Sequence, residues 1–154
     1  MNIETKLQAL GLELPKLSAP AGAYVGNIIH GQFLYVAGQL PMLDGILQYK
    51  GKIGEDADID AGYQAARLSA LHILAQINDA IKGDWGRFDK IIRLNGFVNC
   101  VSDFTDHANV INGASELMAQ ILGDAGKHTR IALGAGSLPR GALVEIDAII
   151  GLKA

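Results

Sequence analysis

The sequence contains little cysteine, little proline and few charged residues. Of its 154 residues, one is cysteine, four are proline and 19% are charged. A single cysteine excludes an internal disulfide, so we expect a reducing compartment, the cytoplasm. Cys100 has the character of a small buried side chain, with a reactive thiol as the alternative.

Long apolar runs and clusters of basic residues are also lacking. No run of about 18 apolar residues occurs, so we expect no membrane span. The opening stretch "MNIETKLQALGLELP" carries acids and lacks the basic-then-apolar layout of a signal peptide. The net charge is −3 with scattered Lys and Arg, which argues against a nucleic-acid partner. The four histidines lack metal-ligand spacing, so no metal is expected.

Apolar periodicity predicts a mixed chain of helices and strands within one domain, residues 1–154, of which 1–20 form an N-terminal extension. The turn pair Asp44-Gly45 predicts a hairpin in 41–54. Helices are expected over 3–10, from a cap at Asp58 or Asp60 to about Lys82, and from a cap at Ser102 or Asp103 to about Leu122. Strands are expected at 28–29, 32–40, 89–100, 129–133 and 142–152.

The two longer helices have the same apolar spacing. Positions 66, 70, 73, 74 and 77 of the first recur 44 residues later at 110, 114, 117, 118 and 121. Two such helices can cover one face of a mixed sheet, but not both faces. The strand at 32–40 is apolar on both faces. We therefore expect a second copy of the chain on the other face, in a homo-oligomer.

Arg130 and Glu145 place charge inside two expected strands. If the Leu138-Pro139 loop turns the chain back, the two residues lie on adjacent strands, and side-chain alternation points both away from the helices. One interpretation is a simple cross-strand ion pair. The other is a site in which the Arg130 fork binds a carboxylate or phosphate and Glu145 positions or deprotonates a water. His128, two residues before Arg130, could add positive charge or act as a base.

The spacing R-x7-LP-x5-EI, formed by Arg130, Leu138-Pro139 and Glu145-Ile146, resembles the closing signature of the Rid family, also called YjgF or L-PSP. Two further stretches are similar to family segments in the same order. They are "AYVGNIIHGQFLYVAGQLP" at 23–41 and "FVNCVSDFTDHANVINGASELM" at 97–118. The resemblance covers about residues 20–151.

This resemblance implies an α+β, chorismate-mutase-like fold: a mixed sheet with two helices on one face, assembled as a trimeric barrel with clefts between subunits. Active members hydrolyse enamines and imines such as 2-aminoacrylate to 2-keto acids and ammonia, without cofactor or metal. The implied catalytic residues are Arg130, which anchors the substrate carboxylate, and Glu145, which activates water. The implied substrate-binding residues are Tyr24, from the neighbouring subunit, Gly38 and Ala132, through their main chains, and Asn112.

Two departures from the family pattern bear on the activity. The family's common Cys two residues after the Arg is Ala132 here, and the Ser before the "GQ" pair is Ala37. A main-chain contact survives at Ala132, whereas a thiol role does not. Two other functions stay open: a non-catalytic protein that binds or senses small carboxylates, and an endoribonuclease, against which the acidic net charge argues.

Overall fold

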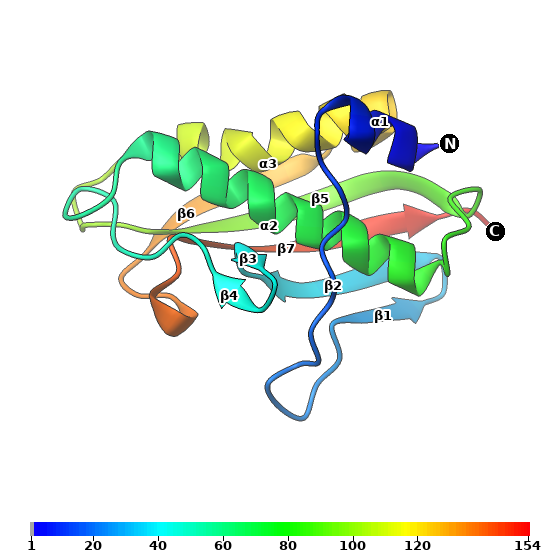
Figure 1. Cartoon of the computed structure of the whole chain (residues 1–154), viewed down its shortest axis with the longest axis horizontal. Coiled ribbons are helices and arrows are strands. Elements are labelled where there is room, and N and C mark those ends of the chain that lie inside the picture. Colours follow the sequence, from blue (N-terminus) through cyan, green and yellow to red (C-terminus); the bar gives the residue numbers. More distant parts are fainter. Residues whose placement is uncertain (1) are drawn as a thin grey trace.

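A computed structural model describes residues 2–154. Its main sheet has five strands in the order β1-β2-β7-β5-β6, and a separate hairpin pairs β3 with β4 (Figure 1). The strands are β1 (Asn27–His30), β2 (Phe33–Gln39), β3 (Met42–Leu43), β4 (Ile46–Leu47), β5 (Phe88–Asn99), β6 (Thr129–Ala135) and β7 (Val144–Leu152). Positive φ angles of 50° at Asp44 and 78° at Gly45 confirm the predicted hairpin turn.

Helix α2 (Ile59–Ala80) begins where the sequence predicts, because the Asp58 side chain accepts a hydrogen bond of 2.8 Å from the Ala61 main-chain N–H. Helix α3 (His107–Leu122) has Asp106 as its N-cap, so the predicted caps at Ser102 or Asp103 are wrong. Residues 101–104 form a separate turn instead, in which the Phe104 N–H donates to the Val101 carbonyl at 3.2 Å.

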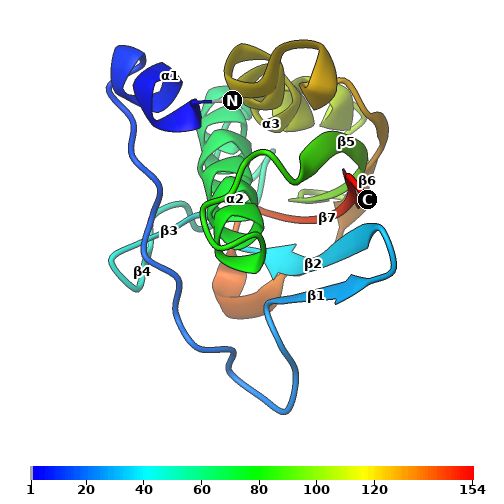
Figure 2. The same ribbon diagram turned by 90° about the vertical axis from the view of Figure 1, so that its right-hand side faces the viewer.

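Both long helices lie on one face of the sheet, as Figure 2 shows, and this confirms the predicted fold class. The ten stripe positions that share the 44-residue spacing are all 0% exposed. A shorter helix, α1 (Ile3–Ala9), adds Ile3 and Leu7 to the core, and its Lys6 donates to the Ile121 carbonyl of α3 at 2.9 Å. Within residues 2–154, no helix has the length and hydropathy needed to span a bilayer.

The strand order corrects one prediction about the charged pair. Strand β5 lies between β6 and β7, pairing parallel with β6 and antiparallel with β7. Arg130 on β6 and Glu145 on β7 are therefore not on adjacent strands. After β5, the connection through α3 places β6 on the side of β5 away from β7. The loop after β6 must therefore cross the end of β5 to reach β7.

The face of the sheet opposite the helices remains open and largely apolar. On β2, Leu34 and Val36 are buried under the helices, whereas Phe33 and Tyr35 are 45% and 42% exposed. Strands β1 and β6 extend this open apolar surface through Ile28, Ile131 and Leu133. The prediction that β2 is apolar on both faces is thus confirmed, and a large apolar surface of this kind is typical of a protein interface.

Candidate functional site

Three of the six predicted site residues, Tyr24, Gly38 and Glu145, line one cavity of about 330 Å³. Glu145 projects from β7, Gly38 belongs to β2, and Tyr24 lies in the segment before β1, where it is 59% exposed. The structure therefore brings these three residues together within a single chain.

Gly38 is required by the position of the Glu145 carboxylate. A Cβ atom at position 38 would overlap Glu145 Oε1 and lie 2.9 Å from its carboxyl carbon. The register between β2 and β7 shifts between Val36 and Gln39, which is the irregularity expected where a glycine admits a close neighbour. A side chain at position 38 would thus displace the carboxylate from the cavity.

The surroundings of Glu145 favour its protonated form. Burial raises the pKa of the Glu145 carboxyl above its ordinary value, and the negative charge of Asp147 raises it further. In the same cavity, burial lowers the pKa of His72, although the hydrogen bond of 2.8 Å between its Nε2 and the Met42 carbonyl opposes this effect. The neutral form of His72 is thus favoured and can donate to the Met42 carbonyl, and Glu145 keeps its proton to a higher pH than an ordinary carboxyl does.

Arg130 and Asn112 form a second group, at the β6 edge of the sheet. The guanidinium donates from Nη1 to Asn112 Oδ1 at 2.8 Å and to Ser115 Oγ at 3.1 Å, and from Nη2 to the Ala108 carbonyl at 3.5 Å. All three acceptors are neutral. Within residues 2–154 the structure has one ion pair, between Lys127 and Asp124, so no carboxylate of the chain neutralises Arg130. The guanidinium is therefore oriented but retains its charge for an external anion.

His128 orients this arginine rather than adding charge to it. Its Nδ1 donates to the Gly126 carbonyl at 2.6 Å, which leaves Nε2 to accept from the Ser115 hydroxyl at 2.9 Å. Burial lowers the pKa of His128, the Gly126 hydrogen bond opposes this, and the Arg130 charge lowers it further. The imidazole is thus neutral at neutral pH, contrary to the expected positive charge, and the chain Arg130–Ser115–His128 fixes the guanidinium.

Arg130 and Glu145 point to opposite faces of the sheet, which corrects the prediction that both leave the helix side. Arg130 is in register with the buried Leu94, which is paired with the buried Ala148, so it shares the helix-facing side. Glu145 is in register with Phe97 and, beyond it, the exposed Leu133. The prediction assumed that the apolar Ile131 and Leu133 of β6 face the helices, whereas they lie on the open face and are 36% and 44% exposed.

Ala132, two residues after Arg130, lies on the same edge strand and packs against the core. The predicted residues therefore fall into two groups, Tyr24–Gly38–Glu145 and Asn112–Arg130–Ala132. Sequence reasoning missed Ser115 beside the second group, and Gln76 and Arg140 in the cavity of the first. The only signal for Arg140 was its place directly after Leu138-Pro139.

Comparisons with known proteins assign the chain to a family. Residues 4–150 match a family described as "YjgF/chorismate_mutase-like, putative endoribonuclease". Protein TCP17 of Trypanosoma cruzi is 40% identical over 98% of this chain and 94% of its own length. A protein of unknown function from Agrobacterium tumefaciens has a TM-score of 0.90 and 45% identity, with 99% of this chain and 94% of that chain covered.

A further solved structure, a "putative endoribonuclease" from Shewanella oneidensis, has a TM-score of 0.94 and 36% identity and covers 99% of this chain and 100% of its own. The family model and these relatives agree with the mixed sheet and its two covering helices. The chain therefore belongs to the YjgF/chorismate-mutase-like family, also called the Rid family.

Proposed function

We propose that the chain hydrolyses reactive enamine and imine carboxylates of the 2-aminoacrylate kind to 2-keto acids and ammonia, in clefts between the subunits of a homotrimer. The observation that carries this proposal is the separation of the two groups of site residues. One supplies a guanidinium without a carboxylate partner, and the other supplies a carboxyl with a raised pKa. The reaction needs both.

Within one chain the two groups cannot meet on a small substrate. Arg130 and Glu145 lie two strands apart, which is about 10 Å at the usual strand spacing. They are also offset by three register positions, roughly 10 Å more along the strands, and they leave opposite faces. A cleft that contains both therefore requires Arg130 of one subunit and Glu145 of another.

The open face of the sheet supports such an assembly. Its exposed apolar side chains include Phe33 and Tyr35 of β2 and Ile131 and Leu133 of β6, at the two sides of the sheet. Three sheets packed around an axis would bury these side chains and bring the β6 edge of one subunit to the β2 side of the next. The small carboxylate-binding clefts would then lie along the shared edges.

The proposed reaction uses each group for one task. An enamine carboxylate tautomerises to the imine, whose carbon is electrophilic. Arg130, held by Asn112, binds the substrate carboxylate in a two-point contact. The ionised Glu145 accepts a proton from water as the water oxygen attacks the imine carbon, and the protonated group then assists departure of ammonia. The imine and one water give one 2-keto acid and one ammonia, so no electrons are gained or lost.

Main-chain groups complete the proposed cleft. The Gly38 carbonyl accepts a long hydrogen bond of 3.5 Å from Gln39 Nε2, and its second lone pair can accept one from the imine nitrogen. The main chain at Ala132 lies on the edge strand and can donate to the substrate carboxylate beside Arg130. Neither contact needs the Ser and Cys that the family pattern has at positions 37 and 132, so we propose that this chain retains the activity.

Subunit mixing tests the proposal directly. Arg130→Ala and Glu145→Gln should each remove ammonia release from freshly generated 2-aminoacrylate by tens- to thousands-fold, the effect of about 2–5 kcal/mol for an unpaired buried charge. Trimers formed from equal amounts of the two variants should regain activity. Random assembly gives about a quarter of the clefts one intact Arg130 and one intact Glu145.

Recovery in the mixture with inactive parents supports a cleft shared by subunits. Inactive mixtures of well-folded variants, or full activity of Arg130→Ala alone, contradict it. Thermal stabilisation by 2-ketobutyrate without any turnover of 2-aminoacrylate would instead establish a carboxylate-binding protein. Cleavage of single-stranded RNA that Arg130→Ala abolishes would favour the endoribonuclease.

A further inference from the structure

A second cavity lies outside the proposed cleft, at the ends of two parallel strands. Strand β5 ends at Asn99 and its parallel neighbour β6 ends at Ala135. A space of about 610 Å³ opens beyond these two ends, within the volume range of small-molecule sites. The carboxyl ends of parallel strands are the usual position of ligands on open sheets.

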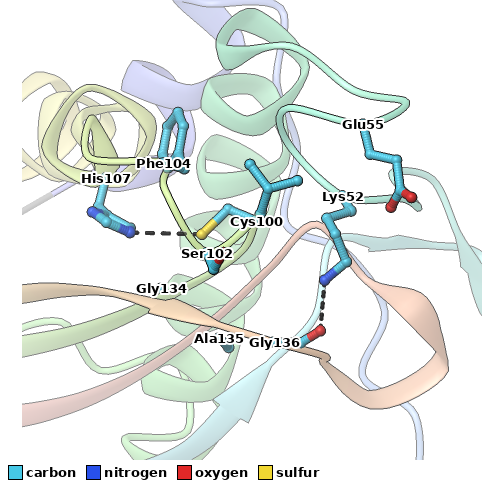
Figure 3. A pocket seen from close by; sticks show the side chains of 10 residues that line it. Lys52, Glu55, Cys100, Ser102, Phe104, His107, Gly134, Ala135 and Gly136 are labelled. Carbon is cyan, nitrogen blue, oxygen red and sulfur yellow. Dashed lines mark hydrogen bonds between the residues drawn. The ribbon is translucent and has the colours of Figure 1, made fainter.

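A thiol and an imidazole meet at the wall of this cavity, as Figure 3 shows. Cys100 follows the last residue of β5 and His107 is the first residue of α3, and Cys100 Sγ lies 3.6 Å from His107 Nε2. The Phe104 ring meets the imidazole edge-on, with ring centroids 5.1 Å apart and an interplanar angle of 79°, which restricts its rotation. The sulfur is thus paired with a base of fixed orientation.

Gly134 keeps the space in front of these two atoms open. A Cβ at position 134 would lie 2.7 Å from His107 Nε2 and 2.9 Å from Cys100 Sγ. Both distances are too short for a real side chain, so an alanine there would push the reactive pair apart or cover it. Glycine at this point of β6 leaves Cys100 and His107 in the cavity wall, where Cys100 is 6% exposed.

Lys52 adds a positive charge to the same cavity. Its Nζ donates to Asn99 Oδ1 at 2.8 Å. It also donates to the Gly136 carbonyl at 2.5 Å, the bond drawn in Figure 3. Both acceptors are neutral, and among residues 2–154 no carboxylate lies within ion-pair distance of this ammonium, Glu55 at the rim included. The two hydrogen bonds hold the ammonium in place, while its third N–H and its charge can serve an anion.

We propose that Cys100, His107 and Lys52 form a second reactive site that takes small carboxylates bearing an electrophilic carbon, such as 2-oxo acids. Lys52 attracts the carboxylate, and His107 Nε2 accepts the thiol proton as the sulfur attacks. With a 2-oxo acid a carbon–sulfur bond forms, the C=O π electrons move to oxygen, and His107 returns the proton to that oxygen. The product is a thiohemiketal, and nothing is oxidised or reduced.

Alkylation of the folded protein tests this site, because Cys100 is the one cysteine of the chain and the label is unambiguous. The probes are iodoacetate, which is anionic, and iodoacetamide, which is neutral. In both reactions sulfur displaces iodide and the thiol proton passes to His107. We expect the wild type to favour iodoacetate over iodoacetamide more than free glutathione does, with the preference falling as salt is added.

Separate variants test the charge of Lys52, the base His107 and the open space at Gly134. Lys52→Met should reduce the iodoacetate-to-iodoacetamide rate ratio by about fivefold, the scale of a local electrostatic attraction, and Lys52→Arg should restore it. Lys90→Met, at an exposed position near the start of β5, removes the same charge and should leave the ratio unchanged. His107→Asn and Gly134→Ala should slow both reagents. Arg130→Ala should react like the wild type, which distinguishes this site from the proposed deaminase cleft.

Two results would overturn the inference. One is an unlabelled folded protein under conditions that label the urea-unfolded chain completely. The other is an iodoacetate preference that is the same in the wild type and in a Lys52→Met protein whose circular dichroism shows it to be folded. If Lys52→Met fails to fold, Lys52→Gln and the salt dependence of the wild type give the same comparison.

Discussion

Arg130 Nη1 lies 2.8 Å from Asn112 Oδ1, so a side chain of helix α3 orients the guanidinium of edge strand β6. Asn112→Asp would turn this neutral acceptor into a carboxylate that competes with the substrate for Arg130. We expect KM to rise about tenfold with a smaller change in kcat, because one charge of the chain would occupy the anion site. The measurement is steady-state release of ammonia over a range of substrate concentrations.

Gln120→Glu is the matched control for Asn112→Asp, since it adds the same charge to α3 at a residue whose partner is Arg67. Its KM should equal that of the wild type. Equal KM values for Asn112→Asp and the wild type would show that Arg130 does not contact the substrate carboxylate.

Gly38→Ala should lower kcat/KM by about 10- to 100-fold, since the new Cβ would displace the Glu145 carboxylate from its position against β2. Gly136→Ala is the control, because a Cβ there meets nothing within 4 Å and the glycine has no positive φ. Unchanged activity in Gly38→Ala would remove Glu145 from the proposed mechanism.

Glu145→Gln should make the fold more stable at neutral pH while abolishing activity. The folded-state pKa of Glu145 is raised by burial and by Asp147, so the native state binds a proton that the unfolded state, with its pKa of about 4.3, has lost. Stability therefore falls as pH rises through the folded-state pKa, and the amide removes this penalty. Below about pH 4 both states are protonated, and the two proteins should differ little.

Thermal melts from pH 4 to pH 8 measure this effect, with Glu13→Gln as a control at an exposed position. In the proposed reaction the same pKa would set the pH profile of the wild type, whose kcat/KM should fall as acid protonates Glu145. A Glu145→Gln protein that melts at a lower temperature than the wild type at pH 8 would contradict the account of its environment.

His72 should make the fold sensitive to mild acid. Burial lowers its folded-state pKa, so below about pH 6.5 the unfolded chain binds a proton that the native state does not. Stability then falls as pH decreases from about 6.5 toward the folded-state pKa. His72→Gln can keep the donor to the Met42 carbonyl without titrating, and its denaturant-derived stability should vary less between pH 7 and pH 5. The exposed His30→Gln should leave the dependence unchanged.

Gly113→Ala should destabilise the fold although alanine is the better helix former. A Cβ at position 113 of α3 would overlap the Tyr63 carbonyl of α2, which cannot move without the helix. We expect a loss of about 1–3 kcal/mol in the free energy of unfolding, the usual cost of overpacking, against a propensity gain of about 1 kcal/mol. A urea titration that shows equal or greater stability would contradict this close helix contact.

Most of the helices and turns could be predicted from the local sequence pattern. The apolar stripes of α2 and α3, the Asp58 cap and the Asp44-Gly45 turn follow from neighbours in sequence, and all were confirmed. Strand order was not predictable in this way, because the position of β5 between β6 and β7 depends on which edges pair after the α3 crossover.

The errors at the candidate site have the same cause, which is that strand pairing cannot be read from local sequence. Arg130 and Glu145 were identified from residue type and spacing, but their opposite faces depend on pairing across three strands. Contacts between distant segments leave no period in the sequence, so these features needed the structure.

In the proposed cleft, a bound carboxylate would contact Arg130 of one chain and Glu145 of another. Such a ligand would hold the two chains together. Its concentration would then set how long the oligomer survives dilution, since a molecule that binds only the assembled form favours that form by mass action. The concentration of that carboxylate would in this way set how much of the chain is assembled.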